Sequence, residues 1–190
     1  MNSFFLFFVG HTHGFIDDFE KQREIIKAVK PEFVLCESLE NLSLVSKEDY
    51  NNILNKRKIS NMSSFEENEN LIRFCFEKNI KLIGMDLENF GFSEIMQNKI
   101  KKQHELTEEE NKEIERILKK RSEHHLEIIK EYLKKTKNPI VVILGSWHLR
   151  DDSLLMNKLE NYKVIFPCDE NGNLLIEPTN GKISYCERIK

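Results

Sequence analysis

The sequence predicts a single α/β domain over residues 1–190, in three layers: a mostly parallel central sheet flanked by helices, with a small C-terminal hairpin. Two observations predict this fold class. Short apolar runs alternate with amphipathic stretches, as buried parallel strands and their helical crossovers require. A chain of 190 residues also suffices for one core of ordinary size. The apolar runs are residues 4–9, 33–36, 80–85 and 140–144.

The segments that follow the first three apolar runs are predicted to form helices that cover the sheet. Asp17 or Asp18 can cap a helix that ends before Pro31. Residues 46–79 and 92–103 have the apolar spacing of further helices.

The second half of the chain predicts one long helix and one margin of the sheet. Thr107 and Glu110 have the spacing of a capping box, which opens a helix that runs to about Lys135. Asp151 or Asp152 can begin the next, shorter helix. The elements expected after the long helix and the fourth run are a helix to about residue 162, a fifth strand at 164–166, and a hairpin of 174–177 with 183–186.

The charge and the hydropathy of the chain argue against two classes of partner. The net charge is −3 at pH 7 and lysines are interspersed with glutamates, so we expect no basic surface for nucleic acid. The apolar run 4–9 is far shorter than the ~20 residues of a membrane-spanning helix, and it lacks the basic flank of a signal peptide. We therefore expect a cytoplasmic protein with neither a nucleic-acid nor a membrane partner.

The cysteines are widely scattered, at Cys36, Cys75, Cys168 and Cys186. Because no two of them form a C-x-x-C pair, the sequence indicates neither a zinc knuckle nor a disulfide framework. Ordinary buried thiols are expected.

Histidines and acids follow the predicted strands directly. In chain order the four runs are followed by Gly-His-Thr-His with His11 and His13, by Glu37, by Asp86, and by Gly-Ser-Trp-His ending at His148. Because the carboxyl ends of parallel strands meet at one edge of a sheet, we expect these side chains to lie together. Gly10 and Gly145 are expected to let the backbone turn sharply off each strand.

The residue types at this edge predict metal-assisted hydrolysis. His13, Glu37 and His148 form the first-choice ligand set for a divalent ion such as Mn, Co or Zn, and His11 can supplement them. Such an ion lowers the pKa of its bound water and polarises a carbonyl group. Without a metal, the same residues still form an acid/base pair in which Glu37 orients or activates a histidine. The sequence leaves both schemes open.

The long predicted helix adds charged residues to its inward stripe, namely Arg121 and His125. Charged groups on a core-facing surface need partners. Arg121 is expected either to neutralise a substrate carboxylate or an oxyanion, or to form a structural ion pair with a buried acid such as Asp86. Asp86 has a further interpretation as the cap of whatever follows Leu87.

Three motifs in order resemble the TraB/PrgY/GumN and Tiki superfamily. They are the G-x-x-H of Gly10 to His13, the strand Pro-Glu-Phe-Val-Leu-Cys that leads to Glu37, and the G-x-x-H of Gly145 to His148. The superfamily is related in fold to erythromycin esterase and to the haem-binding ChaN lipoprotein. The resemblance implies a three-layer α/β fold and, in Tiki-like members, metal-dependent peptide hydrolysis at these His and Glu residues.

Two positions compare differently with that family. Its members usually carry arginine directly after the acid of the middle strand, where this chain has Leu87. Arg121 matches the arginine that the family carries on a late helix.

Three functions follow from these residues. The first is a hydrolase that cleaves an amide or ester bond of a peptide or small molecule, with catalytic residues Glu37, His13, His148 and Arg121. The second is a non-catalytic protein that binds haem, a metal or a peptide at the same histidines. The third is a regulatory or interaction module in which this edge is inactive.

Overall fold

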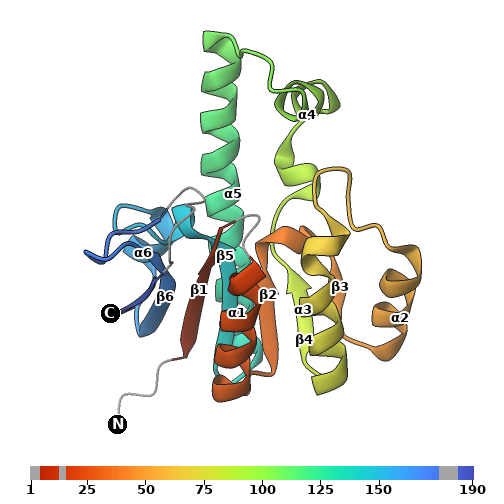
Figure 1. Cartoon of the computed structure of the whole chain (residues 1–190), viewed down its shortest axis with the longest axis vertical. Helices are drawn as coiled ribbons and strands as arrows, with labels where there is room; N and C mark the ends of the chain where they lie inside the picture. Colours follow the sequence, from red (N-terminus) through yellow and green to blue (C-terminus); the bar gives the residue numbers. More distant parts are fainter. Residues whose placement is uncertain (1–4, 13–15, 176–183) are drawn as a thin grey trace.

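A seven-stranded mixed sheet forms the middle layer of the molecule (Figure 1). The computed structural model describes residues 5–12, 16–175 and 184–190. The strand order is β3-β4-β2-β5-β1-β6-β7. The strands are β1 (Leu6–His11), β2 (Phe33–Cys36), β3 (Ser43–Leu44), β4 (Lys81–Gly84), β5 (Ile140–Gly145), β6 (Tyr162–Cys168) and β7 (Ser184–Ile189).

The central strands run parallel, as the sequence predicts. β1 pairs with β5 and β6, and β2 pairs with β4 and β5, all in parallel register. β3 and β7 pair antiparallel at the two margins of the sheet. No sequence pattern indicates β3, because two residues are too few to show a period.

Helices cover both faces of this sheet, which confirms the three-layer α/β class (Figure 1). They are α1 (Ile16–Val29), α2 (Lys47–Lys56), α3 (Phe65–Lys78), α4 (Glu94–Lys101), α5 (Glu108–Lys135) and α6 (Leu154–Lys158). Side chains of α1, α2 and α3 pack with Val141 and Ile143 of β5, whereas those of α5 and α6 pack with Ile140 and Val142. The two apolar clusters arise because successive side chains of a strand point to opposite faces.

The predicted start of α5 is confirmed, whereas the predicted caps of α6 and α1 differ from the structure. Thr107 and Glu110 form the predicted capping box of α5, each side chain accepting from the other's backbone N–H. α6 is capped by Ser153 instead of either preceding aspartate. α1 includes Asp18 in its first turn, so Asp18 is not its cap, and the side chain of Asp17 lies outside the described part.

The carboxyl-terminal region corrects one expectation. Residues 176–183 of the predicted hairpin lie outside the described part, and β7 pairs with β6, while Leu174 forms a single bridge with Cys168. This pairing brings the Cα atoms of Cys168 and Cys186 to 5.8 Å, and the two residues form a disulfide. The prediction of four free thiols was therefore wrong, because spacing in the sequence carries no information on which strands pair. Cys36 and Cys75 are free and buried, as expected.

Two features of the structure bear on where the protein is located. In the part of the chain that the structure describes, no helix is both long and apolar enough to cross a membrane. Disulfides are rare in reducing compartments. The disulfide therefore lends no support to the cytoplasmic location, which stays a prediction.

Candidate functional site

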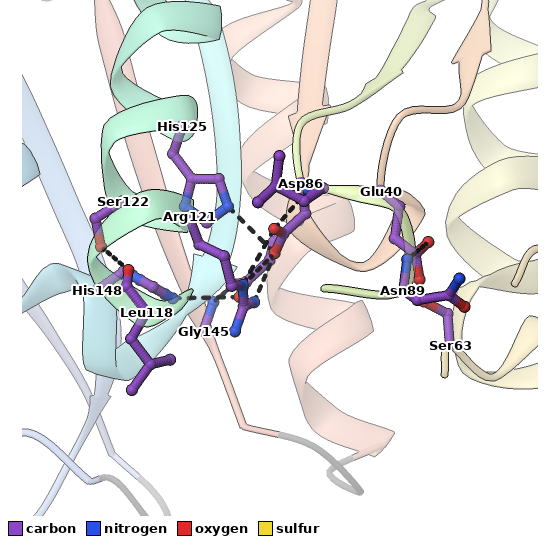
Figure 2. Close-up of polar contacts among 12 residues, drawn as sticks. Glu40, Ser63, Asp86, Asn89, Leu118, Arg121, Ser122, His125, Gly145 and His148 are labelled. Atoms are coloured by element: carbon purple, nitrogen blue, oxygen red, sulfur yellow. Dashed lines mark hydrogen bonds and ion pairs between the residues drawn. The ribbon is translucent and has the colours of Figure 1, made fainter. Parts of the chain in front are cut away.

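The carboxyl edge of the parallel strands carries a buried cluster of charged side chains (Figure 2). β2 leads directly into a single 3-10 turn, η1 (Glu37–Leu39), and β4 is followed by Met85 and Asp86. β5 leads into the turn η3 (Ser146–Leu149), which contains His148. α5 contributes Arg121 and His125 from above this edge. Residues that are far apart in the sequence thus meet, as the parallel topology predicts.

Arg121 joins the two acids of the cluster. Its Nε donates to both carboxylate oxygens of Asp86 at 3.1 and 3.0 Å, and its Nη2 donates to Asp86 Oδ2 at 2.5 Å. The same Nη2 donates to Glu37 Oε1 at 2.6 Å. The phenyl ring of Phe90 lies against the guanidinium, 5.0 Å from Cζ to the ring centroid. Arg121 therefore forms the ion pair with Asp86 that the sequence suggested and also reaches Glu37.

Glu37 connects the arginine to the second Gly-x-x-His loop. Its Oε2 accepts a hydrogen bond from the backbone N–H of Gly145 at 2.6 Å, and its Oε1 lies 3.2 Å from His148 Nε2. A Cβ atom at Gly145 would lie 3.3 Å from Glu37 Oε2, which is tighter than an ordinary contact. The absence of a side chain at position 145 thus lets the carboxylate approach the backbone.

The expected role of the two loop glycines in turning the chain is wrong. Gly145 ends β5 with φ −53° and ψ 135°, a conformation open to other residues, and Gly10 lies within β1. A Cβ atom at Gly10 would lie only 2.9 Å from Cβ of Phe166. A Cβ atom at Gly10 would clash with neighbouring side chains, whereas one at Gly145 would crowd only the Glu37 carboxylate, so space and not backbone conformation is what each glycine provides.

His125 is a member of the cluster that the sequence placed only on an inward stripe. It is fully buried, and its Nε2 lies 3.2 Å from Asp86 Oδ2. Within the described residues, neither ring nitrogen of His125 makes a hydrogen bond of acceptable geometry. The close approach of Nε2 to Asp86 is therefore an electrostatic contact. The ring packs edge-on against that of His148, with centroids 5.1 Å apart. The signal available in the sequence was the four-residue spacing from Arg121, which places both on one helix face.

The surrounding charges shift the pKa values of the two acids. Burial by itself raises the pKa of Glu37, but His148, His125 and Arg121 outweigh burial and hold that pKa well below its usual value. Burial also opposes ionisation of Asp86, yet contacts with His125 and Arg121 lower its pKa. Arg121 correspondingly has a raised pKa, since its two acid partners outweigh its burial. Both carboxylates are therefore ionised over the neutral pH range.

The cluster matches the chemistry of a divalent-metal site in part. One oxygen each of Glu37 and Asp86 and one nitrogen of His125 lie within 4.8 Å of one another, and carboxylate with imidazole is a usual donor set. The buried ring nitrogens of His125 lack hydrogen bonds to described residues, which fits a ligand role. Arg121 already compensates part of the negative charge, so the cluster attracts a cation less than its two acids alone would.

The first of the two predicted histidine runs begins within β1, because His11 is the last residue of that strand. His13 lies outside the described residues, and its contact with Glu37 and His148 stays a prediction. His11 and Thr12 line a cavity of about 500 Å³ between α1 and α3. A second cavity, of about 390 Å³, is lined by Glu37, Arg121 and Phe90. Charged atoms of the cluster thus border open space at the edge of the sheet.

A second buried acid, Glu40, directly follows η1 and does not join the cluster. Glu40 is 2% exposed, and its carboxylate accepts hydrogen bonds from Ser63 Oγ at 3.1 Å and from the backbone N–H of Asn89 at 2.7 Å (Figure 2). Asn89 precedes Phe90, the ring that packs on Arg121. Glu40 therefore supports the segment that covers the arginine.

Comparisons with known proteins add one structural likeness. No protein-family model matches the chain, and no curated protein matches it. One solved structure, described as "Cofacial heme binding to ChaN of Campylobacter jejuni", is similar with a TM-score of 0.45 and 15% sequence identity. The similarity covers 86% of this chain and 81% of that chain. A likeness at this level carries no argument about function, and the resemblance to the TraB and Tiki superfamily stays a prediction.

Proposed function

We propose that this protein is a metal-assisted hydrolase that cleaves an amide or ester bond at the carboxyl edge of its sheet. One observation carries the proposal: the Glu37 carboxylate is held between Arg121, the Gly145 N–H and His148, and it borders a cavity of about 390 Å³. A fixed carboxylate beside an imidazole is the arrangement of an acid/base pair. Peptides or small molecules are the proposed substrates.

Each residue of the cluster has a role in this proposal. In the acid/base role, Glu37 orients His148 through Nε2, so the imidazole accepts or delivers the substrate's proton at its other nitrogen, Nδ1. Arg121 keeps Glu37 ionised and stabilises negative charge that develops on the substrate. Asp86 holds Arg121 in place through its two oxygens.

The proposed metal ligands combine the sequence and the geometry. Glu37, His148, His13 and His11 are the set that the sequence predicts, and the structure adds Asp86 and His125 as neighbours of Glu37. A divalent ion held there supplies Lewis-acid polarisation of the scissile carbonyl and a bound water of lowered pKa.

The test combines elemental analysis with turnover. Purified wild-type protein is loaded with Mn²⁺, Co²⁺ or Zn²⁺, and its metal content and hydrolysis of an ester and peptide panel are measured. For the wild type we expect about one ion per chain and measurable turnover. In Glu37→Gln we expect both the ion and the turnover to be lost. In His148→Ala we expect turnover to fall at least about 100-fold. Glu40→Gln is the matched control, because it changes a buried glutamate of the same segment outside the cluster. His104→Ala, at an exposed histidine, controls for nonspecific metal uptake.

The results separate the parts of the proposal. Turnover that survives complete removal of metal would exclude the ion and retain the acid/base pair. Equal losses in Glu37→Gln and Glu40→Gln would exclude a specific role for the cluster.

A second candidate function is uptake of a metal or haem without turnover. The observation that favours metal uptake is the grouping of Glu37, Asp86 and His125 within 4.8 Å. Haem, named for the similar ChaN structure, enters as a proposed alternative ligand. Titration with haem, followed by its Soret absorbance in wild type and in His148→Ala, tests it. Tight binding of either ligand with no hydrolysis of any substrate would favour this function over the hydrolase.

A further inference from the structure

The exit of β1 is held by hydrogen bonds from two directions. The backbone N–H of Thr12 donates to Asp18 Oδ2 at 2.6 Å, in a buried contact between the β1 exit and the first turn of α1. On the other side, Ser146 Oγ donates to the backbone oxygen of His11 at 3.1 Å. Because Ser146 begins the turn that contains His148, the β1 exit is tied directly to the charged cluster.

The second oxygen of Asp18 connects this exit to the carboxyl-terminal strand. Tyr185, on β7, donates its hydroxyl hydrogen bond to Asp18 Oδ1 at 2.8 Å. Asp18 is only 4% exposed, so this hydroxyl helps to solvate a buried carboxylate. A residue close to the end of the chain thus reaches the loop after the first strand through one aspartate.

β7 itself is fixed on its opposite face. Cys186, the next residue after Tyr185, forms the disulfide with Cys168 of β6. Side chains alternate along a strand, so the disulfide holds β7 from one face while Tyr185 points to the other. The apolar clusters agree: Tyr185 packs with the cluster that contains α1, and Cys186 packs with the cluster that contains α5.

We propose that Tyr185 is a positioning residue that acts through Asp18 to set His11 and Thr12 at the active edge, and that the Cys168–Cys186 disulfide keeps Tyr185 in place. This inference rests on the hydrolase function proposed above, and it adds a residue outside the site that holds the end of β1 in position. Its structural readout does not depend on the reaction, so it can be tested even if no substrate is found.

The test is amide hydrogen exchange and the ¹H–¹⁵N chemical shift of Thr12 in the full chain. In Tyr185→Phe, which removes only the hydroxyl, we expect the Thr12 amide to exchange at least about tenfold faster and its resonance to move. Tyr162→Phe is the matched control, because it removes the hydroxyl of another tyrosine, which is hydrogen-bonded to the backbone oxygen of Met156. We expect Thr12 to be unchanged in that variant.

Two further measurements distinguish positioning from general destabilisation. The amide of Val142, in the central strand β5, reports global opening and should keep its wild-type exchange rate in Tyr185→Phe. The double variant Cys168→Ser, Cys186→Ser should accelerate Thr12 exchange in the same direction as Tyr185→Phe.

Three outcomes would overturn the proposal in whole or part. An unchanged Thr12 amide in Tyr185→Phe removes the role of Tyr185. Equal acceleration at Thr12 and Val142 makes Tyr185 a purely structural residue. Acceleration in Tyr185→Phe together with no effect of the double variant removes the role of the disulfide.

Discussion

Glu37 and Glu40 lie on the same short segment, and both are buried, yet their carboxylates are stabilised by different means. Glu37 is paired with Arg121 and lies beside His148. Glu40 accepts hydrogen bonds from a serine hydroxyl and a backbone N–H, and in the ranges that the structure describes it forms no ion pair. Figure 2 shows Glu40 with its neutral partners set apart from the charged cluster.

The difference separates a chemical role from a structural one. A carboxylate beside a guanidinium and an imidazole has proton donors and a compensating charge within reach of a ligand. A carboxylate held only by neutral donors fixes the segments that supply those donors. Burial alone therefore does not identify a functional acid, whereas the partners of its oxygens do.

Removing the cation that pairs with Glu37 should have the largest effect on stability. Arg121→Met leaves Glu37 and Asp86 without their shared cation, and an uncompensated buried charge costs about 3–5 kcal/mol of the free energy of unfolding. Urea denaturation measures it. Arg116→Met is the matched control on the same helix, because the Arg116 side chain is 77% exposed and pairs with Glu113 at the surface. We expect this variant to change the free energy of unfolding by no more than about 0.5 kcal/mol. Similar losses in the two variants would contradict the assigned role of Arg121.

A glycine lies against each of the two acids, and the two glycines differ in what surrounds them. A Cβ atom at Gly84 would lie 2.0 Å from the backbone oxygen of Glu40, so Gly84→Ala must displace main chain and should cost about 3 kcal/mol or more. A Cβ atom at Gly145 would lie 3.3 Å from the Glu37 side chain, which can shift, so Gly145→Ala should cost about 1 kcal/mol. Thermal unfolding of the two variants checks this order. A larger loss at Gly145 would show that Glu37 is as rigid as the backbone around Glu40.

The smallest expected effect is a change in acid stability. The pKa values of Glu37 and Asp86 are lowered in the folded protein, so at acid pH the unfolded chain binds more protons. The stabilisation from these acids is present above the ordinary carboxyl pKa of about 4 and is lost as the pH falls through their folded values. Glu37→Gln should therefore lose less stability than wild type between about pH 5 and pH 2. Denaturant unfolding at a series of pH values measures both slopes, and equal slopes would contradict the lowered pKa of Glu37.

The sequence predicted the parallel core and much of the cluster, for the same reason. Continuous apolar runs specify buried parallel strands, and parallel strands deliver whatever follows them to one edge. Glu37, Asp86 and His148 were located by that rule, and Arg121 by its place on an inward helical stripe. His125 was noted only as a charged residue in need of a partner. The helical spacing predicted that the side chain of His125 faces inward, but it did not predict which acid the side chain contacts.

Local pattern alone determined the strand runs, the capping box of α5 and the residue types at the carboxyl edge of the sheet, because each depends on neighbours within a few positions. Tertiary structure alone decided the pairing of β7 with β6, the disulfide between Cys168 and Cys186, and the Tyr185 contact with Asp18. It also decided that Arg121 bridges two acids and that Glu40 takes neutral partners. These contacts join residues distant in the sequence, so they depend on how whole elements pack and have no signature in the local order of amino acids.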